Sequence, residues 1–231
     1  MNMKQYLCPT YFIESDHPMI TAFAEEHSRF GKTDVEKAIS IYYAVRDGLR
    51  YNPYSIDSSK TSMKAGTILE RGDGYCVAKA VVLAACLRSQ GIPARLGFAD
   101  VKNHLVTRRL KKLMGTDLFV YHGFTDIFLK GKWVKATPAF NLSLCDKFNV
   151  KPLEFDGLTD SIFQPYNNDG KQYMEYIKDH GTFADLPWDA IAAEFRKRYP
   201  IMYNEPAQAM SGDFYEEALA EKQTENPDSL N

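Results

Sequence analysis

The centre of the fold is encoded in residues 72–95, which read GDGYCVAKAVVLAACLRSQGIPAR. Between Val77 and Leu87 this stretch holds a single charged residue, Lys79, and apolar side chains occur at every position around a helical turn. A helix of this kind is buried nearly all round. The glycines before Cys76 indicate a tight turn, and the Gly-Ile-Pro that follows is a typical helix end. The sequence therefore predicts a central helix that begins at or next to Cys76.

Helical periodicity precedes this helix and strand periodicity follows it. Two helices are predicted before it, His17 to Phe30 and residues 33–50, the second opening with a Thr33–Glu36 capping box. The segments after it that alternate or are rich in apolar residues are predicted strands: Ala94 to Val101, Leu118 to Leu129, and Lys132 to Thr137. Lys130-Gly131 is the expected turn between the last two. Helices followed by strands favour an α+β fold with an antiparallel sheet.

The regular spacing of apolar residues weakens from Leu142 onward, and the expected division of the chain into parts follows from this. We expect residues 1–145 to form the core with its N-terminal helices, 146–222 a C-terminal extension packed on the core, and 223–231 a disordered polar tail. Within the extension, helices are predicted over 185–199 and 212–222. Its aromatic side chains are expected to pack it onto the core or to wall one side of a cleft: Tyr173, Tyr176, Phe183 and Trp188.

Composition excludes several classes of protein. The chain has 231 residues, of which 45% are hydrophobic and 25% charged, and its formal net charge is -2. This composition is that of a globular protein, and it offers no basic excess for binding nucleic acid. No uncharged apolar run is long enough to span a membrane, and the first ten residues do not resemble a secretory signal. We therefore expect a cytoplasmic protein.

The cysteines and histidines show no metal-binding spacing. Four cysteines are spread along the chain without a C-x-x-C pair, and the five histidines form no ligand pattern with them. A nucleotide-binding glycine loop is also missing, because no Lys-Ser/Thr follows Gly72 and Gly74. The sequence thus predicts no metal and no organic cofactor.

Cys76 is the most informative residue for function. At the start of a helix, unpaired backbone N–H groups and the positive end of the helix dipole stabilise a thiolate relative to a thiol. A cysteine in such a position can have a lowered pKa and act as a nucleophile. The alternative is a small buried hydrophobe, which is how most free cysteines behave. For Cys86, inside the same helix, the structural interpretation is favoured.

His122 is the leading candidate for the partner of the thiol. If Lys130-Gly131 closes a two-residue hairpin, His122 lies opposite Ala139, and Thr137 lies one diagonal step away on the same face of the sheet. Asn141 occupies the diagonal position on the other side. An imidazole on a strand, beside a polar group that sets its tautomer, is the usual second half of a Cys-His site. A plain strand histidine at the edge of the sheet is the alternative.

These segments together resemble a known family. The resemblance to the transglutaminase-like superfamily covers roughly residues 33–141 and rests on motifs that appear in order: Gly74-Tyr-Cys76, Leu87-Arg-Ser-Gln-Gly-Ile-Pro-Ala-Arg95, His122-x-Phe-x-Asp126, Gly131-Lys-Trp-Val134 and Thr137-Pro138. It implies a papain-like fold in which the cysteine helix packs on an antiparallel sheet. It also implies that Cys76 is the nucleophile and His122 the general base, in a family of transglutaminases, peptidases and other amide-cleaving enzymes.

The sequence departs from the family pattern at one position. The family commonly carries Asp-Pro-Thr after the tryptophan strand, with the aspartate orienting the histidine, but here the stretch is Ala136-Thr-Pro-Ala139. Either Thr137 suffices, or Asn141 takes the orienting role, or the site has lost catalysis and kept a binding cleft. We favour the first two because Cys76 and His122 are both retained. Asp126 shares the face but lies further from the open end of the hairpin.

The sequence therefore predicts a thiol enzyme that attacks an amide or peptide carbonyl through Cys76, His122 and Thr137. The expected substrate is a peptide, a protein or a small amide, and hydrolysis is favoured over transfer to an amine. The alternatives are a catalytically silent peptide-binding module of the same fold, and an acyl or amine transferase that acts on a small molecule. The oligomeric state is not specified by the sequence.

Overall fold

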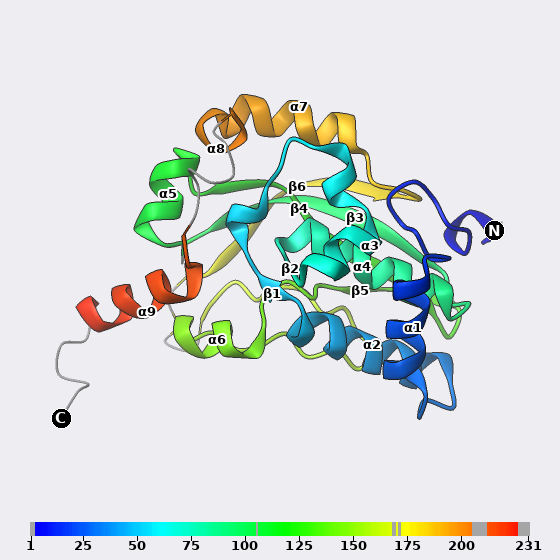
Figure 1. The fold of residues 1–231 in the computed structure, drawn as a ribbon. Helices are drawn as coiled ribbons and strands as arrows, with labels where there is room; N and C mark the ends of the chain where they lie inside the picture. The colour runs from blue at the N-terminus through cyan, green and yellow to red at the C-terminus, as the bar shows by residue number, and fades with distance from the viewer. Residues whose placement is uncertain (1–2, 105, 168–169, 171, 205–211, 226–231) are drawn as a thin grey trace.

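A four-stranded antiparallel sheet runs through the middle of the molecule, with strand order β5-β4-β3-β6 (Figure 1). Its strands are β3 (Ala94–Asn103), β4 (Leu118–Leu129), β5 (Lys132–Ala136) and β6 (Met174–Phe183). The structure is a computed structural model that describes residues 3–104, 106–167, 170, 172–204 and 212–225. Helices pack on this sheet, which confirms the α+β fold predicted from the sequence.

The remaining elements are helices and one short parallel strand pair. The pair joins β1 (Arg50–Tyr51) to β2 (Asp73–Gly74). The α-helices are α1 (Pro18–Ser28), α2 (Asp34–Gly48), α3 (Ala65–Arg71), α4 (Cys76–Ser89), α5 (Arg108–Met114), α6 (Leu142–Phe148), α7 (Trp188–Arg198), α8 (Pro200–Asn204) and α9 (Phe214–Glu225). Three short 3₁₀ turns complete the described part: η1 (Lys4–Tyr6), η2 (Pro53–Ser55) and η3 (Lys60–Met63).

Helix α4 is the centre of the core, as predicted. It packs against β3 and β4 on one side and against α1, α2 and α3 on the others. Every residue from Cys76 to Arg88 is buried, including the one charged residue of its apolar stretch, Lys79. The Lys79 Nζ donates hydrogen bonds of 2.7 Å to the carbonyl oxygens of Arg46 and Leu49 at the end of α2. Burial lowers the pKa of Lys79 well below its usual value, and these carbonyls replace water as its hydrogen-bond acceptors.

The hairpin of β4 and β5 has the predicted turn and register. Leu129 pairs with Lys132, and the pairing continues to Thr125 and Ala136. Lys130 and Gly131 both have positive φ, as a two-residue hairpin turn of this kind requires. The Thr125 hydroxyl donates to the Ala80 carbonyl oxygen of α4, so odd-numbered residues of this part of β4 face the helix. The even-numbered residues Phe124 and Asp126 lie on the other face.

The first helices differ from prediction only at their ends. The cap of α1 is His17, whose Nδ1 accepts a hydrogen bond from the Met19 N–H, so the helix itself begins at Pro18. The capping box is present in α2, where Thr33 and Glu36 bond reciprocally to each other's backbone N–H groups.

The elements that were not predicted include the helices α3, α5 and α6 and the strand β6. The three helices have seven residues each, too few for a helical period to stand out. Strand β6 lies at the edge of the sheet, and between Glu175 and Asp179 all of its residues are exposed, so polar and apolar positions do not alternate. An edge strand exposed on both faces leaves no hydrophobic signature in the sequence.

The C-terminal part of the chain contacts the core in three places. Strand β6 pairs with β3, α7 and α8 lie at the top of the view, and α9 lies beside α6 on the side away from the N-terminal segment (Figure 1). Of the expected polar tail, residues 226–231 lie outside the described residues, and 223–225 end α9. The division into core, extension and tail stays a prediction.

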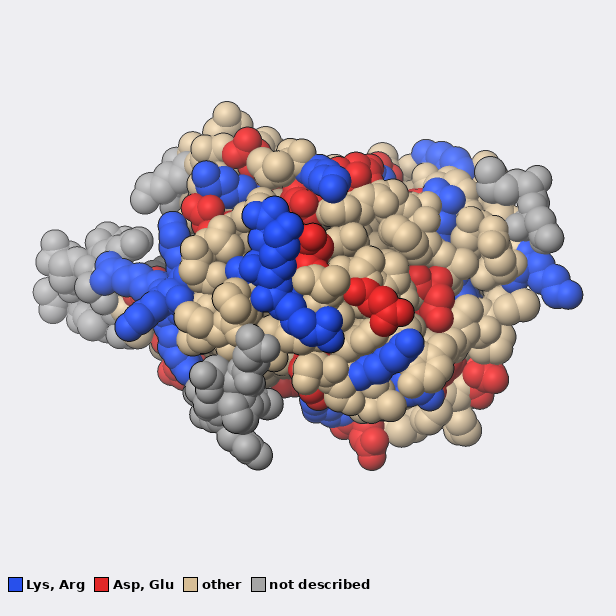
Figure 2. Space-filling model, turned by 90° about the horizontal axis from the view of Figure 1, so that it is seen from above, with Lys and Arg blue, Asp and Glu red and all other residues tan. Residues whose placement is uncertain are grey.

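The surface over α7 carries charges of both signs. In Figure 2, basic and acidic side chains lie beside one another among larger uncharged areas, so this face is not of one sign. Within the described ranges, no helix is both long and apolar enough to cross a membrane.

Candidate active site

The thiol of Cys76 stands at the first residue of α4, directly after a sharp turn. Gly72 ends α3 in the left-handed conformation with φ of 76°, which glycine adopts without strain. Asp73 and Gly74 then pair with Arg50 and Tyr51 before the chain enters α4. A Cβ on Gly74 would lie 2.7 Å from the Cβ of Ala78, so the close entry into the helix requires glycine. The predicted turn and helix start are both present.

His122 reaches the same place from β4. It pairs with Ala99 of β3, and only 5% of its surface is exposed. Its ring meets the ring of Phe163 edge-on, with centroids 5.3 Å apart. His122 and Cys76 line one pocket, so the fold brings together the two residues that the sequence singled out.

The pocket that contains Cys76 and His122 is narrow and apolar. Its other lining side chains come from the β1–η2 segment, Tyr75, α5, the start of β4, and α7 with α8: Tyr51, Pro53, Ile56, Tyr75, Leu110, Met114, Phe119, Val120, Phe195, Tyr199 and Met202. The cavity has a volume of about 30 Å³, well below the roughly 300–1,000 Å³ of common small-molecule sites. We call this arrangement the closed pocket.

Burial determines the ionisation of both residues. It raises the pKa of the Cys76 thiol to about 11, while the nearby backbone N–H groups of Gly123, Val77 and Cys76 act in the opposite direction. Burial also lowers the pKa of His122 to about 4. At neutral pH the closed pocket therefore holds a thiol and a neutral imidazole. The expected lowering of the Cys76 pKa at a helix start is wrong here, because desolvation is larger than the effect of the N–H groups.

Thr137 follows β5 and is buried. Its N–H donates to the Ser161 carbonyl oxygen, and its own carbonyl oxygen accepts from the Tyr42 hydroxyl. Its Oγ1 has no hydrogen-bond partner among the described residues. The hydroxyl thus makes no hydrogen bond to His122 in the closed pocket, and its orienting role stays a prediction.

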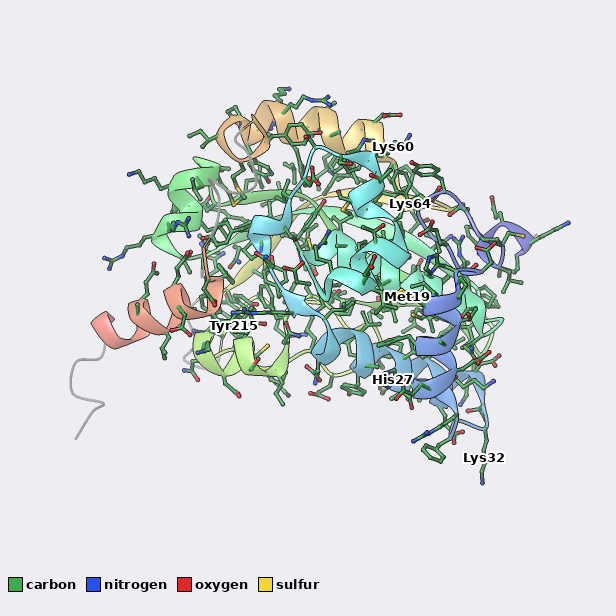
Figure 3. All side chains as sticks on the ribbon, viewed as in Figure 1. Met19, His27, Lys32, Lys60, Lys64 and Tyr215 are labelled. Atoms are coloured by element: carbon green, nitrogen blue, oxygen red, sulfur yellow. The ribbon has the colours of Figure 1, made fainter. Side chains whose placement is uncertain are left out.

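Asn141 is fully occupied elsewhere. Its Oδ1 accepts hydrogen bonds of 2.7 Å from the Tyr51 N–H and the Tyr215 hydroxyl, and its Nδ2 donates to carbonyl oxygens at the end of α2. Tyr215 stands where α9 begins against α6 (Figure 3). Asn141 therefore joins α2, β1 and α9, and these contacts leave neither end of its amide directed at His122.

Asp126 is also committed to another partner. Its carboxylate accepts hydrogen bonds from Arg95 Nε at 2.9 Å and Nη2 at 2.7 Å, and its side chain is nearly buried. This pairing lies on the outer face of the sheet, away from α4. In the part of the chain that the structure describes, no three His, Cys, Asp or Glu side chains gather in a way that could hold a metal ion.

Much of the pocket wall was missed by the sequence analysis. Phe195 of α7, Met202 of α8 and Tyr199 between the two helices stand more than a hundred positions after Cys76. The Tyr199 hydroxyl accepts from the Val120 N–H at 2.6 Å and donates to the Leu118 carbonyl oxygen at 2.8 Å, which fixes α7 to the start of β4. The aromatic content of the predicted helix over 185–199 was the available signal.

Comparison with known proteins identifies the architecture. The core model described as the transglutaminase-like superfamily matches residues 21–138, which is more than half of the chain. The chain belongs to the transglutaminase-like superfamily. The match spans α1 to α4 and the β3–β5 part of the sheet, and it includes Cys76, His122 and Thr137. Helices α7 and α8, which cover the pocket, lie outside the transglutaminase-like match.

Two solved structures are similar to this transglutaminase-like chain. A putative cysteine protease from Cytophaga hutchinsonii has a TM-score of 0.47 and 14% identity, over 79% of this chain and 54% of that one. A putative protease from Parabacteroides distasonis has a TM-score of 0.39 and 18% identity, over 62% of this chain and 26% of that one. The chain thus spans about half of the first protein's length and about a quarter of the second's. None of the curated proteins matches it.

Proposed function

We propose that the protein is a cysteine amide hydrolase. The Cys76 sulfur adds to the carbonyl carbon of the substrate, and His122 takes the thiol proton and delivers it to the departing amine as the C–N bond breaks. Water then attacks the thioester, releases the carboxylic acid and restores the thiol. The observation that carries the proposal is that Cys76, at a helix start, and His122, from a separate strand, line one pocket.

The backbone N–H groups around Cys76 are the proposed donors to the oxyanion that forms during the attack. The backbone N–H groups of Gly123, Val77 and Cys76 already act on the Cys76 sulfur. Donors at a helix start are positioned before the reaction, so they stabilise developing negative charge without reorganisation. The raised thiol pKa and the lowered imidazole pKa both come from burial, so both shifts shrink when substrate and water open the pocket.

The pocket lining supports an uncharged substrate. None of the lining side chains is acidic or permanently charged, and most are aromatic or aliphatic. An amide with a small apolar acyl group matches this surface, whereas a charged one would lose its hydration without gaining a partner. The lining also offers no carboxylate to hold an amine acceptor. This favours hydrolysis over transfer.

We assign Thr137 as the residue that orients His122. The hairpin register expected from the sequence sets Thr137 one diagonal step from His122, and Thr137 directly follows Ala136, the last paired residue of β5. Its buried Oγ1 is free, among the described residues, to accept a hydrogen bond from an imidazole N–H. Asn141, the other candidate, has both ends of its amide in use.

Trapping of the acyl-enzyme tests the proposed function. The protein is mixed with p-nitrophenyl acetate, nitrophenolate release is followed, and the acetylated residue is located by peptide mass mapping. A Cys8→Ser background removes the most exposed cysteine. We expect acetyl on Cys76, none in Cys76→Ala, and a loss of about a hundredfold or more in the Cys76 rate in His122→Ala. A folded protein that is not acetylated at Cys76 would contradict the proposal.

Two observations favour a second candidate, a catalytically silent peptide-binding module. Thr137 stands where the family commonly has the orienting aspartate, and the pKa of Cys76 is raised. This second candidate predicts that peptides bind in the pocket but that Cys76 is never acylated. A transferase would instead partition the acyl group to an added amine, such as glycine ethyl ester. The ratio of acid to amide product in the trapping experiment separates it from a hydrolase.

A further inference from the structure

Strand β4 carries a β-bulge immediately before His122. Val101 of β3 pairs with Phe119, and Ala99 pairs with His122, so Asp100 alone opposes two residues of β4. One of these is Tyr121, whose φ is 53°. A bulky residue in the left-handed region is strained, and it persists only where its surroundings hold it.

A second bulge stands at the matching point of β6. Phe98 pairs with Gly181 and Ala99 with Asp179, so His180 is an extra residue there. Strands β4 and β6 flank β3 and are separated by roughly 9.5 Å, twice the normal strand spacing. The rings of Tyr121 and His180 nevertheless stack over β3, with centroids 4.0 Å apart and planes at 15°.

Asp100 joins the two bulges. Its Oδ1 accepts a hydrogen bond of 3.0 Å from the Tyr121 N–H and one of 2.7 Å from His180 Nε2. The side chains of His180 and Asp100 are only 11% and 13% exposed, so water competes weakly for these bonds. The carboxylate gives the Tyr121 N–H an acceptor within the bulge, while the Val120 N–H donates to the Tyr199 hydroxyl. We refer to Asp100, Tyr121 and His180 as the bulge cluster.

We propose that the bulge cluster positions His122 for reaction with Cys76; this rests on the proposed function. Side chains alternate with a period of two along a strand, so absorbing the extra residue of β4 into regular pairing would turn the neighbouring side chains to the opposite face. Bulges are a common means of aiming a side chain at an active site. Asp100 and His180 hold Tyr121 in its strained conformation, and the next residue, His122, thereby lines the Cys76 pocket.

The test measures the acetylation rate of Cys76 by p-nitrophenyl acetate, mapped by mass spectrometry, across pH. Asp100→Ala is expected to lower the rate about a hundredfold, because a misplacement of about 1 Å costs that much. The pH–rate profile of Asp100→Ala should lose the part that depends on His122. It should then coincide with the pH–rate profile of His122→Ala. Asp100→Asn keeps the acceptor oxygen and should recover most of the rate.

His104→Gln is the matched control. His104 follows the far end of β3, lies 3.7 Å from Glu175 of β6, and does not line the pocket. The His104→Gln substitution therefore removes a histidine–carboxylate pair beside β3 and β6 without touching the bulges. The acetylation rate of Cys76 should equal that of the wild type. A merely structural role for Asp100 would lower the unfolding midpoint while leaving the pH profile of the folded protein unchanged.

Two results would overturn the inference separately from the proposed function. If Asp100→Ala folds and acetylates Cys76 at the wild-type rate while His122→Ala does not, the bulge cluster does not position His122. Should Asp100→Ala fail to fold, His180→Ala on the exposed edge strand becomes the deciding variant. We expect it to lower the acetylation rate of Cys76 by about tenfold or more, because His122 loses its positioning. An unchanged rate in His180→Ala would count against the inference. Equal rates in wild type and His122→Ala would overturn both proposals.

Discussion

Gly123 of β4 lies directly against Val77 of α4. A Cβ on Gly123 would come within 2.9 Å of the Val77 Cα, closer than side chains tolerate. The absence of a side chain at this position therefore allows the strand that carries His122 to approach the first turn of the helix that carries Cys76. The Gly123 N–H also lowers the pKa of the Cys76 thiol against the larger effect of burial.

Gly123→Ala should consequently destabilise the protein and separate the two elements. The added methyl meets backbone atoms of α4, which cannot move like the end of a flexible side chain, so we expect a loss of about 1–3 kcal/mol in the free energy of unfolding. Urea denaturation measures it. Gly48→Ala is the control, because nothing lies within 4 Å of its added Cβ in α2; it should stabilise by about 0.5–1 kcal/mol. Equal effects of the two substitutions would argue against a close contact.

Burial of His122 should make stability fall in mild acid. The folded pKa is about 4 and the reference value is 6.5, so between these pH values the unfolded chain binds a proton that the folded protein excludes. The free energy of unfolding should therefore drop by about 3 kcal/mol more in wild type than in His122→Gln as pH falls from 6.5 to 4. Urea titrations at both pH values measure the difference. His27→Gln, at an exposed position on α1 (Figure 3), should keep the wild-type dependence.

Removing part of the cover should make Cys76 more reactive. Met202 of α8 is buried and lines the pocket, so Met202→Ala admits water and reduces the burial that raises the Cys76 pKa to about 11. Each unit of pKa lowering gives about ten times more thiolate at neutral pH. Iodoacetamide labelling of Cys76 should accelerate accordingly, at a cost of about 2–5 kcal/mol in stability.

Ile201→Ala provides the comparison for this experiment. Ile201 precedes Met202 in the same helix but is 50% exposed and does not line the pocket. Its substitution should leave the labelling rate of Cys76 unchanged. If Met202→Ala labels no faster than Ile201→Ala, α8 does not control the ionisation of the thiol.

Thr137 and Asn141 should separate activity from stability. Asn141→Ala removes the hydrogen bonds that join α2, β1 and α9, so we expect a loss of about 2 kcal/mol or more with an unchanged Cys76 acetylation rate in the folded protein. Thr137→Val removes a buried hydroxyl without a partner among the described residues. It should stabilise by up to about 1 kcal/mol and lower the rate about tenfold. The opposite pattern would assign the orienting role to Asn141.

The predictable parts of the fold were those encoded by local patterns. Helix α4 could be recognised because its apolar residues surround the whole helix, and the β4–β5 hairpin because Lys130 and Gly131 form its turn. The expected hairpin register was extended as far as Asn141, beyond the observed strand. The chain leaves β5 at Ala136 and begins α6 at Leu142. The amide of Asn141 is hydrogen-bonded to α2, β1 and α9, which are distant in sequence.

The primary structure was enough to single out the two residues that line one pocket, because a turn, a helix start and a strand are set by residues close together in the chain. Their ionisation was established only by the folded molecule. The pKa of Cys76 rises to about 11 because desolvation outweighs the N–H groups at the helix start. That desolvation comes from side chains such as Phe195, Tyr199 and Met202, which only tertiary packing brings over the thiol.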